Sequence, residues 1–130
     1  MTNRKVSATQ ELAYWFVREI FGREFDYRGD GQHLRNAKML LSPSDSGGEA
    51  FTIEEIQKTL LSMRDGLFND IGWPRDRPIQ TMLAVLWGNP RFIDRVRSRT
   101  HVPPCPDWYY ETSVRKWHEK YDKYIVKVYE

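Results

Sequence analysis

The 130-residue sequence contains little of what secreted or membrane proteins need. Its single cysteine, Cys105, excludes a disulfide within the chain, and disulfides are common in small secreted domains. No hydrophobic run approaches the roughly 20 residues of a membrane-spanning helix. Residues 1–6 also lack the apolar segment of a secretion signal. The sequence therefore predicts a cytoplasmic protein without membrane contact.

Metal ligands and catalytic motifs are equally scarce. The soft metal ligands are Cys105, His33, His101 and His118, and two prolines between His101 and Cys105 exclude the helical geometry that would bring them together. The glycine-rich stretch 46–48 lacks the lysine and the strand of a phosphate-binding loop. We therefore expect no metal site, no cofactor and no enzymatic activity. A catalytic site assembled from distant residues is the enzymatic alternative.

Charge of neither sign is in large excess, since the formal net charge is +2. The distribution is uneven, however. Residues 1–90 hold 11 lysines and arginines against 12 acidic residues, whereas residues 91–130 hold 9 against 6. The C-terminal part is therefore mildly basic, which favours an acidic partner there.

The clearest positive signal is hydrophobic residues at helical spacing between residues 52 and 99. Thr52 and Glu55 match a capping box, and Phe51 and Ile56 occupy the two positions of a hydrophobic staple. An apolar stripe follows, formed by Ile53, Ile56, Leu60, Met63 and Leu67. This pattern predicts a central helix over residues 53–67.

Capping residues, prolines and glycines predict the other helices. Ser7 and Gln10 match a second capping box, ahead of a helix that is expected to end at Gly22. Prolines at the first helical position favour two further helix starts. The remaining helices are expected over residues 32–41, 78–87 and 90–99, and from residue 107 or 112 to about 124. Residues 124–129 are also rich in strand formers.

These elements predict an all-α fold, a compact single-domain bundle of five or six short helices over residues 1–130. Residues 1–6 are expected to be a loose start, residues 42–50 a flexible loop, and residues 102–130 a C-terminal extension. For residues 124–129 the sequence leaves both helix and extended strand open. The core is expected to contain Leu12, Phe16, Ile20, Ile56, Leu60, Met63, Leu83, Leu86, Phe92, Val96, Val114 and Trp117.

Arginines recur every four residues on the helix expected over residues 90–99. Arg91, Arg95 and Arg99 would line one helical face, with Arg97 beside them. Such a row can neutralise several phosphates of a nucleic acid, and each contact adds to a salt-dependent affinity. The alternative is a solvated outer face whose arginines pair with acidic residues.

Further cations and aromatic rings occur in the C-terminal extension. Lys116 and Lys120 are one helical turn apart with Arg115 adjacent, and Trp108 and Tyr109 lie just upstream. Proteins that bind single strands combine such cations with aromatic stacking. This interpretation predicts single- or double-stranded DNA as the partner. Interspersed lysines and glutamates on a merely soluble helix are the alternative.

A loop bounded by Pro74 and Pro78 carries Trp73, Arg75 and Arg77. A rigid loop with an aromatic tip is a plausible protein-docking element. In the alternative arrangement, Trp73 folds back and covers the core.

Four short motifs, spread over roughly residues 12–96, carry a family resemblance. They are Trp15–Phe25, which ends in a Gly-basic-X-Phe element; Arg35, Lys38 and Leu40–Leu41; Phe51–Ile56; and Arg77–Pro78 through Phe92. Together they resemble the conserved C-terminal domain of phage replication proteins, of the replisome-organiser or helicase-loader type. The sequence departs from that family in two ways: it lacks the winged-helix DNA-binding domain that usually precedes this region, and it has its own extension over residues 102–130.

The resemblance implies a replication accessory or helicase-loading role in a phage or mobile element, through DNA and protein contacts and without catalysis. Together with the basic residues, it makes a non-enzymatic module that binds nucleic acid or a replication protein the leading hypothesis. The alternative is a protein-interaction adaptor or inhibitor that docks through exposed aromatic loop residues and does not bind nucleic acid.

Overall fold

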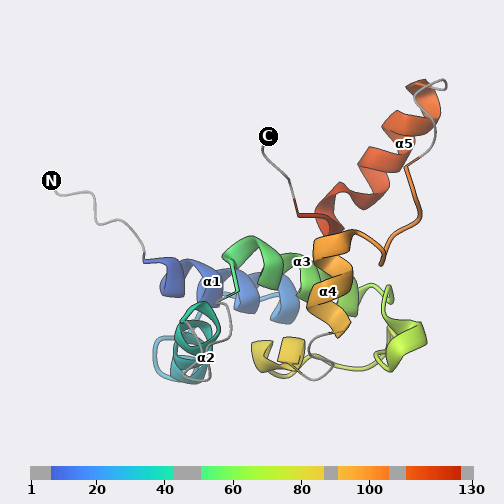
Figure 1. Ribbon diagram of the computed structural model, residues 1–130. Coiled ribbons are helices and arrows are strands. Elements are labelled where there is room, and N and C mark those ends of the chain that lie inside the picture. The colour runs from blue at the N-terminus through green and yellow to red at the C-terminus, as the bar shows by residue number, and fades with distance from the viewer. Residues whose placement is uncertain (1–6, 43–50, 87–90, 106–110, 127–130) are drawn as a thin grey trace, which may run out of the picture.

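The structure is a computed structural model, and it describes residues 7–42, 51–86, 91–105 and 111–126. These residues form five α-helices and no β-strand, which confirms the predicted all-α fold. The α-helices are α1 (Ala8–Phe16), α2 (Gly31–Leu41), α3 (Ile53–Arg64), α4 (Arg91–Ser98) and α5 (Glu111–Tyr121). In Figure 1, α1 to α4 pack into one body and α5 projects away from it.

The capping box predicted at the start of α1 is present. The Ser7 hydroxyl accepts the backbone N–H of Gln10 at 3.1 Å, and the Gln10 side chain accepts the N–H of Ser7 at 3.1 Å. The helix continues as one π-helical turn, η1 (Val17–Phe21), and ends at Gly22. Gly22 has a φ of 69°, a left-handed conformation that glycine adopts without strain.

The connection from η1 to α2 is folded around one buried carboxylate, that of Asp30. Arg23 donates two hydrogen bonds to it at 2.6 and 2.8 Å, and the backbone N–H of Asp26 donates a third at 2.8 Å. The hydrogen bond from Arg23 holds the pKa of Asp30 well below its ordinary value. This connection returns the chain so that α2 packs against α1.

The central helix α3 starts as the sequence predicts, since Thr52 and Glu55 exchange both hydrogen bonds of the capping box. A backbone bond of 3.2 Å from Phe51 to Leu40 joins its start to the end of α2. The helix ends at Arg64, three residues before the predicted Leu67. Gly66 follows with a φ of 84°, and this left-handed residue turns the chain out of the helix.

The helix predicted over residues 78–87 is wrong for residues 78–81, which are not helical. A short 3-10 helix, η3 (Met82–Leu86), takes its place, after a second 3-10 turn, η2 (Asn69–Ile71). Thr81 explains the later start, because its hydroxyl accepts the N–H of Leu83 at 3.3 Å and a hydrogen bond from Asn36 at 2.9 Å. Residues 87–90, where this predicted helix ends and the next begins, lie outside the described residues.

The main core joins α1, α2, α3, η3 and α4. Seven of the expected core residues are buried: Leu12, Phe16, Ile56, Leu60, Met63, Phe92 and Val96. Ile20, Leu83, Val114 and Trp117 are only partly buried. Leu86 is wrong as a core residue, because it lies at the end of η3 and is 37% exposed. Buried residues absent from the expected core include Phe68, Trp73, Met82 and Val85.

A second, smaller cluster fixes the C-terminal part to the end of α3. Val102 and two residues that follow α5, Tyr124 and Ile125, are buried in it, and Trp117 and Tyr121 pack against it. Tyr124 lies in a short 3-10 helix, η4 (Asp122–Tyr124), and its hydroxyl donates a 2.7 Å hydrogen bond to Asp65. We call α5 and η4 together the arm.

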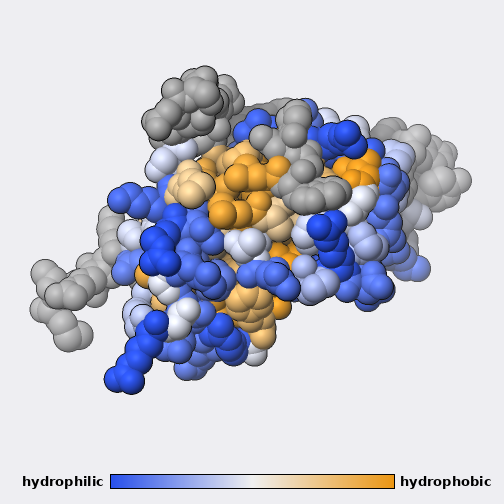
Figure 2. All heavy atoms as spheres, turned by 90° about the horizontal axis from the view of Figure 1, so that it is seen from below, coloured by the Kyte–Doolittle hydropathy of each residue, from blue (hydrophilic) through white to orange (hydrophobic). Residues whose placement is uncertain are grey.

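The face that lies below the body in Figure 1 carries exposed hydrophobic side chains. Figure 2 shows a patch of hydrophobic side chains at its middle, surrounded by polar residues. Leu83, Ala84 and Leu86 of η3 line a shallow groove together with Pro78 and Thr81. Among the described residues, no helix has the length and apolar character needed to span a membrane.

Candidate nucleic-acid interface

The arginines of α4 do not form the uniform solvent-facing row that one interpretation of the sequence predicts. Arg95 donates a 2.7 Å hydrogen bond to Asp70 of η2, and Arg97 forms an ion pair with Glu55 of α3. Both arginines therefore join α4 to neighbouring segments of the body. For these two residues the structure agrees with the alternative interpretation, in which the row pairs with acidic residues.

The Arg97–Glu55 pair is the more buried of the two. The Glu55 side chain is 10% exposed, whereas that of Asp70 is 63% exposed. Burial favours the neutral acid, but hydrogen bonds from Arg97 and from the Thr52 backbone outweigh burial and lower the pKa of Glu55. Arg97 therefore compensates a buried charge and has a structural role.

Arg91 and Arg99 differ from these two because neither has an ion-pair partner among the described residues. Arg99 donates a 3.1 Å hydrogen bond to the carbonyl of Val126, and its own backbone closes α4 with a φ of 61°. Such a left-handed conformation is uncommon outside glycine. Arg91 is exposed at the start of α4 and is the α4 arginine best placed to contact a ligand.

The cations of α5 that the sequence predicts as ligands are exposed. No residue of α5 is buried, and Arg115, Lys116 and Lys120 are all exposed. Lys116 and Lys120 lie one turn apart on the same face, and Lys123 continues that face in η4. Glu119 borders this face, which therefore carries three lysines beside one acid. Trp108 and Tyr109, the predicted stacking residues, lie outside the described residues.

The arm is held by its aromatic side, which leaves the lysine face to solvent. The indole N–H of Trp117 donates a 2.9 Å hydrogen bond to the carbonyl of Pro103, and the Trp117 and Tyr121 rings lie 5.6 Å apart. Lys120 lies 5.2 Å from the ring of Tyr121, close enough for a cation–π contact. The projecting helix thus has one anchored side and one basic side.

The ring of Trp73 is 4% exposed and belongs to the main core, so it is not an exposed docking tip. Arg77 covers it, with the guanidinium carbon 4.0 Å from the ring centre. The alternative, in which Trp73 folds back over the core, is what the structure shows. Arg75 is exposed on the same loop, so docking through Arg75 and Arg77 stays a prediction.

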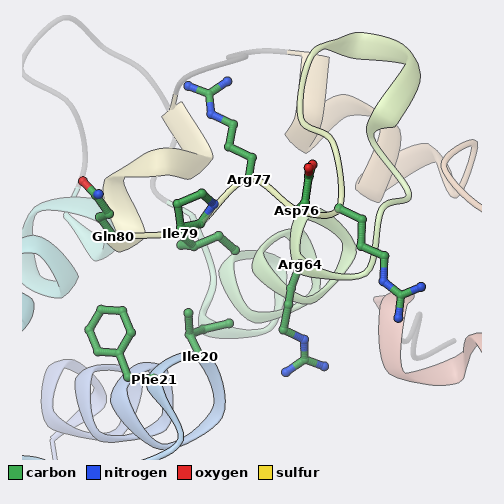
Figure 3. A pocket seen from close by; sticks show the side chains of 9 residues that line it. Ile20, Phe21, Arg64, Asp76, Arg77, Ile79 and Gln80 are labelled. Atoms are coloured by element: carbon green, nitrogen blue, oxygen red, sulfur yellow. The ribbon is translucent and has the colours of Figure 1, made fainter.

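This loop borders a groove of about 690 Å³. Figure 3 shows Ile20 and Phe21 of η1 facing Ile79 across it, while the guanidinium groups of Arg64 and Arg77 point in opposite directions. Arg64 is also bound to Asp65 at 3.1 Å. Because the cations do not converge on one point, the groove lacks the form of a phosphate site. Its apolar walls suit a side chain of a protein partner.

A cluster of aromatic rings at the surface is absent from the site residues that the sequence predicts. Tyr14 of α1 lies 4.8 Å from Phe25 and 6.0 Å from Tyr27, measured between ring centres. Phe25 and Tyr27 alternate in the sequence, and Tyr27 begins a turn over residues 27–29. Their alternation is the feature of the sequence that could have indicated an aromatic pair. No feature near Tyr14 indicates that its ring lies beside this pair.

The buried histidines serve the packing of the fold. His33 is 1% exposed, packs against Phe16 and Phe21, and has its Nε2 3.7 Å from Asp30. His101 lies between the carbonyls of Arg95 and Tyr124, at 3.1 and 2.7 Å. Burial lowers the pKa of both histidines. Within the described residues, no three His, Cys, Asp or Glu side chains lie close enough together to hold a metal ion.

Comparisons of this chain with protein families, with curated proteins and with solved structures find no match.

Proposed function

We propose that this protein is a non-enzymatic module that binds nucleic acid through the basic face of its arm, formed by Arg115, Lys116, Lys120 and Lys123, with Arg91 as a further contact. The observation that carries the proposal is the exposed lysine face of α5, on a helix that projects from the body. Extended basic faces of this kind neutralise backbone phosphates. The paired arginines Arg95 and Arg97 are not part of the proposed surface.

Binding of a fluorescent 20-nucleotide DNA, single-stranded and as a duplex, over a range of salt concentrations tests this proposal. Replacing Lys116 and Lys120 together by alanine should weaken binding and reduce the salt dependence, by roughly 0.7 to 0.9 in the log–log slope for each phosphate that is no longer neutralised. Lys38→Ala is the matched control, because Lys38 is an exposed lysine on α2. Absence of binding at low salt, or equal effects of the arm variant and the control, would reject the proposal.

The narrower role, a DNA-replication accessory of a phage or mobile element, is supported by the resemblance within residues 12–96. In that role the protein contacts DNA and a second replication protein without catalysis. Co-purification with a replicative helicase encoded beside it would support this role. A neighbourhood without replication genes would count against it.

The groove beside Arg75 and Arg77 supports a second candidate, a protein-interaction adaptor or inhibitor. Its apolar walls and basic edge suit a protein segment with an apolar side chain next to an acidic one. A stoichiometric complex that survives nuclease treatment and is lost in Arg75→Glu would favour this candidate. The Lys116/Lys120 double variant should leave such a complex unchanged.

A further inference from the structure

Three aromatic rings form a cluster at the surface of the body. Tyr14 lies on α1, and Phe25 and Tyr27 lie on the turn that follows η1. Their centres are 4.8 to 6.0 Å apart, and the two tyrosine hydroxyls are hydrogen-bonded at 3.1 Å. Tyr27 is 75% exposed, more than any other large hydrophobic side chain in the described part of the chain. A ring that is fixed by its neighbours and still faces water is available to a ligand.

The turn that presents Tyr27 is held by hydrogen bonds within residues 23–30. Asp26 accepts the N–H of Arg28 at 3.0 Å, and the backbone of Asp26 exchanges two bonds with Asp30, at 2.8 Å each. Asp30 is itself bound by Arg23. The ring cluster is therefore positioned before any ligand arrives, which reduces the ordering cost of binding.

A groove of about 610 Å³ adjoins the rings, a volume that suits a small planar ligand. Its lining includes Arg18 and Arg23, and one acidic side chain, that of Glu24. The Arg18 side chain is 68% exposed and has a long contact of 3.8 Å with Glu19. Exposed rings beside a guanidinium group are the combination that holds an unstacked base and its phosphate.

We propose that this cluster, formed by Tyr14, Phe25 and Tyr27 with Arg18 at its edge, stacks an unpaired base, so that the nucleic acid bound by this protein is single-stranded. The inference rests on the proposed function and deepens it by naming the substrate class. In a duplex the bases are stacked inside, and their faces do not reach a surface ring. The cluster therefore discriminates between the two forms, whereas the lysines of the arm do not.

The two surfaces contribute in different ways, which makes them separable. The charged residues that line this groove are Arg18, Arg23 and Glu24, and Arg23 is bound to Asp30, so the net charge there is close to zero. Stacking is worth about 1–3 kcal/mol per base, which corresponds to roughly 5- to 150-fold in affinity. Tyr27→Ala should weaken binding of a 20-nucleotide single strand by that factor without changing the salt dependence, and should leave duplex binding unchanged.

Two variants control for structure. Tyr27→Phe keeps the ring and loses only the hydroxyl bond to Tyr14, so it should bind as the native protein does. Met39→Ala removes a 58% exposed hydrophobic side chain on α2 outside the groove and should have no effect. Circular dichroism of Tyr27→Ala checks that the helices are kept, which the exposure of the ring leads us to expect.

The outcomes separate the two proposals. Suppose that the native protein binds both forms of DNA. If Tyr27→Ala then binds both as tightly as the native protein does, or binds both more weakly by the same factor, the inference is overturned and the proposed function stands. Failure of the native protein to bind either form at low salt would overturn the proposed function and this inference with it. Selective loss of single-strand binding in Tyr27→Ala, together with native-like binding by Tyr27→Phe, supports the inference.

Discussion

The body and the arm use the same charged residues for opposite purposes. In the body, Arg95 and Arg97 each bind a carboxylate from a different segment, so their charges join elements that are distant in sequence. Arg23 binds Asp30 and fixes the connection between η1 and α2. In the arm, Lys116 and Lys120 stay exposed on a helix without a buried residue. Composition alone does not distinguish these cases. What separates them is whether an acid from another segment lies within reach.

Packing differs in the same way. The body closes around one core that draws on α1, η1, α2, α3, η3 and α4. Within it, the Phe92 ring stacks on Phe68 and lies edge-on to Trp73. The arm depends on the small cluster around Val102 and Tyr124. We therefore expect substitutions in the body to cost more stability than comparable substitutions in the arm, and the following predictions test that ranking.

The largest effect should come from Phe92→Ala. Phe92 is fully buried, and its ring stacks on Phe68 with centres 4.6 Å apart. Its removal leaves a cavity in the main core and should lower the free energy of unfolding by about 3–5 kcal/mol. Trp117→Ala is the matched change in the arm, and it should cost less than half as much because Trp117 is only partly buried. Urea unfolding followed by circular dichroism measures both. Equal losses would show that the arm is an integral part of the core.

A second comparison lies within α4. Arg97→Ala leaves the largely buried Glu55 carboxylate without its guanidinium partner and should cost about 1–3 kcal/mol, the range for a buried polar group that loses a partner. Arg95→Ala breaks an exposed pair with Asp70 and should cost less than about 1 kcal/mol. The same urea unfolding experiment measures the free energy of unfolding of both variants. If Arg95→Ala proved as costly as Arg97→Ala, burial would not be the property that separates structural from available cations.

The buried histidines predict a loss of stability in mild acid. Burial lowers the folded pKa of His33 and His101 below the ordinary value of 6.5, so the unfolded chain takes up protons first. Stability is therefore complete above 6.5 and declines as the pH falls below it, by at most about 1.4 kcal/mol per pH unit for each histidine. Asp30 and Glu55, whose pKa values are lowered, lose their contribution only at more acidic pH.

His33→Leu sharpens this test, because leucine keeps apolar packing against Phe16 and Phe21 and removes one titrating group. Unfolding free energies at pH 7 and pH 5 should differ less in this variant than in the native protein. His101 should account for the remaining difference, since it joins α4 to Tyr124 at the base of the arm. A native protein equally stable at both pH values would contradict the prediction.

Local signals in the sequence predicted the parts of the fold that local chemistry determines. Both capping boxes and the stop at Gly22 are confirmed, because each depends on residues within one turn. The prediction of a helix start at Pro78 is wrong, because a hydrogen bond from Asn36, 45 residues away, fixes Thr81 directly before η3. The helix propensities of the residues around Pro78 contain no information about a contact with Asn36.

The same distinction between local and distant determinants applies to the residues of the candidate site. Spacing alone predicted that Arg91, Arg95 and Arg99 line one helix. In the structure Arg95 binds Asp70 and Arg99 binds the carbonyl of Val126, and both partners come from other segments. The aromatic cluster also depends on a distant contact, since Tyr14 reaches Tyr27 only because the chain folds around Asp30. Residues whose role is set by a partner far along the chain are therefore the ones that sequence periodicity misassigns.

The smallest effect on stability is expected from replacing Lys116 and Lys120 together by alanine. Both lysines are exposed, and neither forms an ion pair within the described residues, so the free energy of unfolding should change by no more than about 0.5 kcal/mol. Alanine is also a good helix former, so α5 itself should persist. Urea unfolding of this variant beside Arg97→Ala gives the comparison directly. A loss of about 1 kcal/mol or more would mean that the lysines are bound to the body in solution, and it would remove the reason for assigning them to a ligand. An unchanged stability together with weakened DNA binding would show that the arm keeps its cations for a partner, while the body uses its own for folding.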